Sequence, residues 1–176
     1  WQHAAVNDLG VINAHFDKRT QVKQFGGKYA NRAYRWQDNI RTKAVEKLFP
    51  DYFTGFRNLH APAAYRKSTF EAVWNAEPEL LRRTTSHRFR SADDVNQWVC
   101  LWWQIASGQF APFNTDNVVS CADESAMDEL CRIIHTQSHD MLCINDPEKP
   151  VDFETLSARL RGAFAEILPE KSEFEI

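Results

Sequence analysis

The spacing of apolar residues predicts a helix-rich chain with two short strands. In most segments apolar residues recur every three or four positions, the interval that gives a helix one buried face. NVVSCA and DMLCIND are instead short apolar runs with polar ends, which favours buried strands. We expect helices at about 4–16, 39–49, 67–75, 78–83, 91–108, 124–135 and 152–168, and strands at about 117–122 and 140–146. This order suits the outer layer of an α/β domain better than a free-standing helical bundle.

Capping residues and helix breakers set the expected boundaries of the early elements. Asp38 is predicted to cap the short helix that follows it, and Pro50 to end that helix. Residues 24–36 are expected to form a loop, because two adjacent glycines disfavour a regular element there. Pro78 fits the first turn of its helix, where no backbone N–H is needed.

The segment SADDVNQWVCLWWQIASG, residues 91–108, predicts the clearest helix of the chain. Ser91 is its expected N-cap, and Gly108 its expected end. Asp93 and Asp94 stand in the first turn, where the helix dipole favours acidic side chains. The apolar positions of this helix are Val95, Trp98, Val99, Trp102 and Ala106. The last helix is expected to bury a stripe of Phe153, Leu156, Leu160, Phe164 and Ile167.

Composition and charge narrow the classes of partner. The length of 176 residues fits a single domain, 1–176, or the larger part of one. The net charge of −3 gives no electrostatic argument for a nucleic acid partner. From Arg57 to Arg90, however, seven Lys and Arg face three Glu. A locally basic stretch in an acidic chain favours a small anion over a polyanion.

The remaining composition points to a protein of a reducing compartment. No segment has the features of a signal peptide, and no apolar run approaches the roughly 18 residues of a membrane span. The first residue is Trp1 rather than Met, so we expect a longer parent protein. The four cysteines form no C-x-x-C pair and have apolar neighbours, which favours buried free thiols over zinc ligands.

The first candidate for chemistry is RNLHAP, where an extended stretch runs into a turn at Pro62. It carries Arg57, Asn58 and His60. A neutral imidazole at His60 could take a proton from an attacking hydroxyl, because its ordinary pKa lies close to working pH. The alternative is a loop histidine that hydrogen-bonds to the backbone.

The second candidate is TTSHRFRSADD. In an extended segment Arg88 and Arg90 would point to one side while Phe89 anchors the other. Two arginines beside a helix start suit a diphosphate, because each guanidinium binds phosphate oxygens in pairs. The alternative is structural: Asp93 and Asp94 pair with the arginines.

The third candidate is CINDP. Asn145 and Asp146 follow an apolar strand, and ligands of open α/β sheets bind at the carboxyl ends of strands. Asp146 could be a metal ligand or a base, and Asn145 could hold a sugar hydroxyl or a phosphate oxygen. An Asn-Asp-Pro turn without a ligand is an equal alternative.

Taken in order, these blocks resemble the Stealth family. Its members are capsular polysaccharide phosphotransferases of bacteria and the catalytic subunit of the animal lysosomal-enzyme N-acetylglucosamine-1-phosphotransferase. The matching segments are HAPAAYRKSTFEAVW, TTSHRFRSADD and CINDPEKPVDFETLSARLRGAFAEILPEKSEFE. The resemblance runs from about residue 1 to 175 and corresponds to the third and fourth conserved regions, with the tail of the second. The first region and the start of the second, which help build the nucleotide-sugar site, are not in this sequence.

The resemblance implies a fold and a reaction. The fold is the helix-rich C-terminal part of a glycosyltransferase-A-like, Rossmann-type α/β catalytic domain. The reaction moves a sugar-1-phosphate from a nucleotide-diphosphate sugar, typically UDP-N-acetylhexosamine, to a hydroxyl of a saccharide acceptor. The product is a phosphodiester in a capsular polysaccharide or exopolysaccharide. A non-catalytic module that binds phosphorylated or acidic glycans and an ordinary sugar-only glycosyltransferase are the alternatives.

The resemblance also implies roles for the candidate residues. His60 would be the general base or would orient the acceptor hydroxyl, and Arg88 and Arg90 would form a phosphate clamp. Asp146 would complete the catalytic group, with an Mg²⁺ or Mn²⁺ ion at Asp146 left open and no organic cofactor. The expected substrate-binding residues are Arg57, Asn58, Ser91 and Asn145, although Ser91 is favoured as a helix cap and His87 as a structural residue. We expect a bacterial cytoplasmic protein, with peripheral association at the inner face of the membrane as an open alternative.

Overall fold

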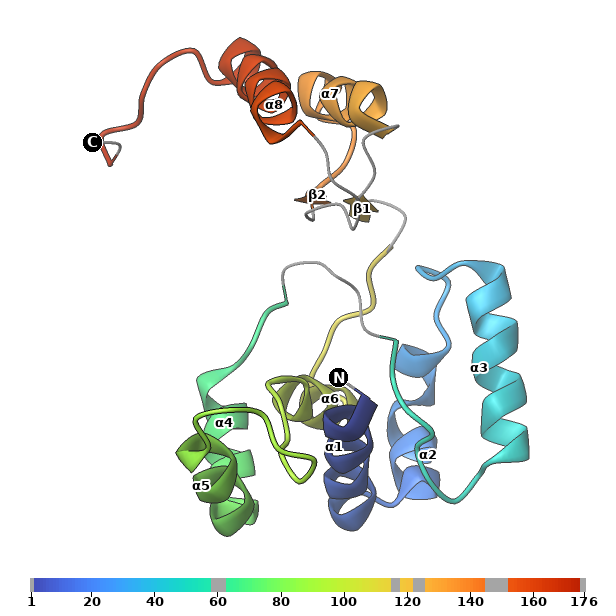
Figure 1. The fold of residues 1–176 in the computed structure, drawn as a ribbon. Coiled ribbons are helices and arrows are strands. Elements are labelled where there is room, and N and C mark those ends of the chain that lie inside the picture. The colour runs from blue at the N-terminus through green and yellow to red at the C-terminus, as the bar shows by residue number, and fades with distance from the viewer. Residues whose placement is uncertain (1, 58–62, 115–117, 122–125, 145–151, 175–176) are drawn as a thin grey trace. The chain divides into compact units, whose positions relative to one another are not determined.

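The computed structural model describes residues 2–57, 63–114, 118–121, 126–144 and 152–174, which fold into two compact units. Described residues up to Asn114 form the first unit, and those from Val118 onward form the second. The elements are α1 (Gln2–His15), α2 (Lys18–Tyr29), α3 (Trp36–Leu48), α4 (Lys67–Ala76), α5 (Pro78–Ser86), α6 (Trp98–Ala106), β1 (Val118–Cys121), α7 (Met127–Thr136), β2 (Met141–Ile144) and α8 (Phe153–Ile167) (Figure 1). The prediction of a single domain, 1–176, stays a prediction.

The core of the first unit lies between α1 and α6. One apolar cluster joins Val11 of α1 and Val99 of α6 to α4 and α5 through Val73 and Leu81. A second cluster joins Ile12 and Trp102 on the same two helices to Phe53 and Ala106. Because both clusters share α1 and α6, these two helices fix the positions of the segments around them.

The second unit is a β–α–β–α segment. Strands β1 and β2 pair in parallel, with Val118 opposite Met141, and α7 connects them along the chain. α7 then packs on α8 through Met127, Leu130 and Leu156. A parallel pair joined by a helix is the basic unit of α/β folds, so the strand predictions are confirmed in this part of the chain.

The helix-rich prediction is confirmed, and the helices expected near 4–16, 67–75, 78–83, 124–135 and 152–168 are present. In the last of these helices, α8, fewer residues of the apolar stripe are buried than expected. Leu156 is buried and Leu160 packs against the same cluster, whereas Phe153 and Phe164 are exposed. Asp152 caps α8 by accepting a hydrogen bond from the backbone N–H of Thr155.

The loop predicted over residues 24–36 is wrong in its first half, because α2 runs through both glycines to Tyr29. Long-range contacts outweigh the low helix propensity of glycine here. The Tyr29 hydroxyl donates to the carbonyls of Ile105 and Ala106, and the Lys28 ammonium donates to that of Gly108. These bonds tie the end of α2 to the end of α6.

The boundaries of α3 also differ from expectation. The helix begins at Trp36, so Asp38 lies in its first turn rather than at its cap. The Asp38 carboxylate instead accepts a hydrogen bond of 3.2 Å from the Arg57 guanidinium. α3 contains no fully buried residue, and Trp36, Ile40 and Leu48 on it are exposed.

The remaining findings concern the state of the cysteine side chains and the search for a membrane-spanning helix. Cys100, Cys131 and Cys143 carry thiols rather than disulfides, as expected, although of these three only Cys100 is buried. Burial raises the pKa of the Cys100 thiol to about 11, so it stays protonated near neutral pH. In the part of the chain that the structure describes, no helix has both the length and the apolar character of a membrane span.

Candidate functional site

The candidate site is the segment between α5 and α6, residues 87–97, which we call the arginine loop. The predicted helix 91–108 is wrong in its first third, since α6 begins only at Trp98. Ser91 is therefore not an N-cap, and Asp93 and Asp94 do not lie in the first turn of a helix. Gly108 follows the end of α6 with a φ of 69°, as expected of a terminating glycine.

Asp94 organises the first half of the arginine loop. One carboxylate oxygen accepts a hydrogen bond of 2.7 Å from the backbone N–H of Ser91, and the other pairs at 2.7 Å with Nδ1 of His87. The Ser91 bond and then the His87 contact hold the pKa of Asp94 below its usual range. Asp94 is thus a buried anion that joins the two ends of the span from His87 to Ser91.

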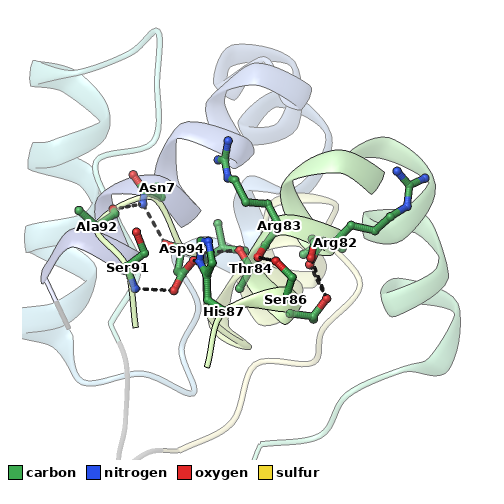
Figure 2. Close-up of polar contacts among 12 residues, drawn as sticks. Asn7, Arg82, Arg83, Thr84, Ser86, His87, Ser91, Ala92 and Asp94 are labelled. Carbon is green, nitrogen blue, oxygen red and sulfur yellow. Dashed lines mark hydrogen bonds and ion pairs between the residues drawn. The ribbon is translucent and has the colours of Figure 1, made fainter. Parts of the chain in front are cut away.

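Helix α1 holds the second half of the arginine loop. The Asn7 amide donates hydrogen bonds of 2.8 Å to the carbonyls of Ala92 and Asp94 (Figure 2). The next residue, Asp8, accepts a 3.1 Å hydrogen bond from the backbone N–H of Asn96. Figure 2 shows Asn7 reaching the loop beside Ser91 and Asp94.

These contacts explain why the loop is not helical. In a helix the Ala92 carbonyl would accept from the Asn96 N–H, but Asn7 and Asp8 bind these two groups instead. The Val95 N–H is likewise directed to the hydroxyl of Thr84 on α5. Side chains of other elements therefore occupy the backbone groups that a first turn of α6 would need.

Asp8 is fully buried, and one of its carboxylate oxygens has no hydrogen-bond partner among the described residues. Burial raises the pKa of Asp8 to about 7, although the bond from Asn96 acts in the opposite direction. Near neutral pH this carboxyl is therefore partly protonated. One pattern in the sequence could have identified it: Asp8 precedes Val11 and Ile12 by three and four positions, which places Asp8 on the buried face of α1.

We expect the free energy of unfolding to fall as pH rises through the pKa of Asp8, and we expect the D8N substitution to reduce this fall. Between pH about 4 and 7 the folded state keeps a proton on Asp8 that the unfolded state releases, so the free energy of unfolding falls with pH. Between pH about 5 and pH about 8, the free energy of unfolding of the D8N variant should therefore fall by about 2–3 kcal/mol less than that of the unsubstituted chain. Urea denaturation at these two pH values measures the difference.

Asp17, the N-cap of α2, supplies the control for that experiment. Hydrogen bonds from the hydroxyl and the backbone N–H of Thr20 hold the pKa of Asp17 below its usual range, so Asp17 is ionised at both pH values and the D17N variant should lose the same free energy at each. A D8N effect that is equal at the two pH values would contradict a raised pKa for Asp8.

The arginine side chains of the loop lie at the surface. Arg88 and Arg90 are exposed, and the Arg88 guanidinium lies over the ring of Phe89 at 5.5 Å from its centroid. The expectation that Phe89 anchors the opposite side is wrong, since 78 % of this residue is exposed. Stacking on an aromatic ring leaves the edge of a guanidinium accessible to phosphate oxygens.

The structure describes some of the other predicted site residues and not the rest. Arg57, His87 and Ser91 lie in the first unit, where Arg57 pairs with Asp38 and His87 and Ser91 bind Asp94. Asn58, His60, Asn145 and Asp146 lie outside the described residues, and their roles stay predictions. Sequence reasoning missed Asn7 and Asp8, which hold the arginine loop.

The described residues contain no group of three or more His, Cys, Asp or Glu side chains that could hold a metal ion. A fully protein-bound metal site is therefore not present in that part of the chain. The ion predicted at Asp146 stays a prediction, because this residue lies outside the described residues.

Comparison with known proteins finds one matching family model and several similar phosphotransferases. Residues 59–101 match the Stealth protein CR3, conserved region 3. The chain is 31% identical over 99% of its length to the receptor polysaccharide phosphotransferase WefC of Streptococcus gordonii, covering 51% of that protein. It is 32% identical over 96% of its length to the capsular polysaccharide phosphotransferase WcwK of Streptococcus pneumoniae, covering 50% of it.

A third relative is the exopolysaccharide phosphotransferase cps2G of Lactiplantibacillus plantarum, 31% identical over 99% of this chain and 51% of that protein. The chain thus spans about half the length of the curated relatives that it matches. No solved structure matches it. The matched region 59–101 includes the whole arginine loop, residues 87–97. The chain thus carries conserved region 3 of the Stealth family, and along almost its whole length it is similar to polysaccharide phosphotransferases.

Proposed function

We propose that this chain supplies the phosphate-binding part of an enzyme that transfers a sugar-1-phosphate in capsular polysaccharide or exopolysaccharide synthesis. The observation that carries the proposal is the arginine loop: two exposed arginines in a segment that Asp94 and α1 hold in a non-helical form. The relatives named as polysaccharide phosphotransferases support the reaction class.

The donor is a nucleotide-diphosphate sugar of the UDP-N-acetylhexosamine type, and the acceptor is a hydroxyl of a saccharide. The acceptor oxygen forms a bond to the β-phosphorus, and the bond from that phosphorus to the oxygen bridging the two phosphates breaks. The sugar-1-phosphate is transferred and UMP leaves. The acceptor proton passes to a base, for which His60 has the suitable side chain.

Arg88 and Arg90 neutralise the non-bridging oxygens of the diphosphate, where negative charge gathers in the transition state. Arg57, Asn58, Ser91 and Asn145 contribute to substrate binding. Asp146 would hold a divalent cation, Mg²⁺ or Mn²⁺, which would supply positive charge to neutralise the phosphates. No organic cofactor takes part. The enzyme works in the bacterial cytoplasm, and peripheral association with the inner face of the membrane is the alternative.

The test follows the β-phosphate. UDP-N-acetylhexosamine labelled at that phosphate is supplied with oligosaccharide acceptors to the full-length gene product, and label is measured in glycan, UDP and UMP. We expect label in the glycan and unlabelled UMP. Label that stays in UDP would identify a sugar-only glycosyltransferase. Glycan binding without turnover across a panel of donors would identify a non-catalytic binding module.

A further inference from the structure

The feature behind this inference is the way Asn7 crosses from α1 to the arginine loop, over 85 positions of sequence. Its side-chain amide uses both N–H groups, one on the Ala92 carbonyl and one on the Asp94 carbonyl. A single side chain therefore fixes the backbone on both sides of Asp93.

Asp94 links this contact to the arginines. Asn7 holds the backbone of Asp94, while the Asp94 carboxylate binds His87 and Ser91 at the two ends of the span that contains Arg88 and Arg90. Both ends of that span are thus fastened to one carboxylate. The backbone that carries Arg88 and Arg90 is therefore held by Asp94, and the backbone of Asp94 is in turn held by Asn7.

We propose that Asn7 is a positioning residue for phosphate binding by Arg88 and Arg90. The inference rests on the proposed function of the arginine loop and names a residue far away in sequence on which that function depends. Asn7 need not touch the donor. Its loss releases the loop carbonyls and allows the guanidinium groups to leave the geometry that binds phosphate oxygens.

The chain offers a matched control on the same helix. The Asn13 amide donates at 2.9 Å to the carbonyl of Phe53, and its oxygen accepts at 2.8 Å from the Phe53 N–H. Asn13 is as buried as Asn7 and also makes two hydrogen bonds from α1 to the backbone of a distant segment. Its partner is not in the arginine loop, so N13A reports the general cost of losing such a contact.

The experiment measures turnover of UDP-N-acetylhexosamine and equilibrium binding of UDP by the full-length gene product. We expect N7A to weaken UDP binding and kcat/KM by about 10–100-fold, the size of effect that misplaced binding groups produce. N13A should lower thermal stability while changing UDP affinity less than about twofold. N7Q keeps the amide donors and should restore part of the affinity.

A double-mutant cycle separates positioning from general stability. In the background R88A/R90A, N7A should change UDP affinity less than about twofold further, because the groups that it positions are absent. The same further loss of affinity from N7A with and without the arginines would overturn the inference. If N7A does not fold, N7S, which keeps one donor, carries the same cycle.

The outcomes distinguish this inference from the proposed function. If R88A/R90A abolishes turnover and N7A has the same UDP affinity as N13A, the positioning role is wrong and the phosphate clamp stands. If R88A/R90A leaves turnover and UDP affinity intact, the clamp itself is wrong and the role of Asn7 falls with it.

Discussion

Replacing Arg88 by alanine in the full-length gene product should lower donor turnover by about 10²–10³-fold. Losing one preorganised group that meets developing charge typically has an effect of this size. Arg88 is exposed and stacked on Phe89, so its removal takes away a charge without opening a cavity in the core. The measurement is kcat/KM for UDP-N-acetylhexosamine, together with the melting temperature.

The same reasoning applies to Arg90, where R90K should lose much of the activity. A lysine ammonium keeps the charge but cannot bind two phosphate oxygens through one planar group. The control is R82A, since Arg82 lies nearby on α5 and pairs with Glu79 at the surface. We expect R82A to keep close to full activity. Near-normal turnover of R90K would count against a bidentate clamp.

The second large effect is expected at His60. H60A should reduce turnover by about 10²–10⁴-fold, the contribution of a positioned general base, while UDP binding persists. This expectation follows from the proposed roles, in which His60 acts on the acceptor hydroxyl and the arginine loop binds the phosphates. Turnover and UDP affinity, measured on the same preparation, separate the two roles.

H135A is the matched control for H60A. His135 lies at the surface of α7 and pairs at 2.8 Å with Glu166 of α8. Its removal should leave turnover and UDP affinity unchanged. Loss of UDP binding in H60A would place this histidine with the phosphate groups instead of the acceptor, and unchanged turnover would exclude it as the base.

Local pattern was sufficient for most of the fold. The periodicity that predicts α1, α4, α7 and α8 comes from apolar residues that each helix buries, so the signal and the structure have the same cause. α2 escaped prediction because its stability depends on contacts of Tyr29 and Lys28 with the end of α6, which no local window contains.

The start of α6 escaped prediction for a different reason. Ser91 and Asp94 have the spacing of a helix start, and the Asp94 carboxylate does bind the Ser91 N–H as it would in a capping box. The helix does not follow, because Asn7, Asp8 and Thr84 bind the next backbone groups. Only knowledge of which segments pack against residues 92–96 could have revealed this.

The sequence was sufficient to name the candidate arginines, but it did not reveal the residues of α1 that hold the arginine loop. Arg88 and Arg90 were identifiable because basic side chains gather in an otherwise acidic chain. Asn7 was not, because a polar residue in a helix carries no local sign of its distant partner. Asp8 was recognisable as a polar residue on an apolar face, but the pattern does not say what it binds.

The competition between α1 and the first turn of α6 has a consequence for how the protein acquires its shape during folding. The signals for a helix start at Ser91 are local and act early, whereas the contacts of Asn7 and Asp8 join residues 85 to 88 positions apart. Contacts of such long sequence separation form late, because their loop-closure entropy must first be offset. We therefore expect residues 91–97 to sample helical turns before α1 docks on α6 and to lose them as it docks. In that case the arrangement of Arg88 and Arg90 is acquired in the last step of folding.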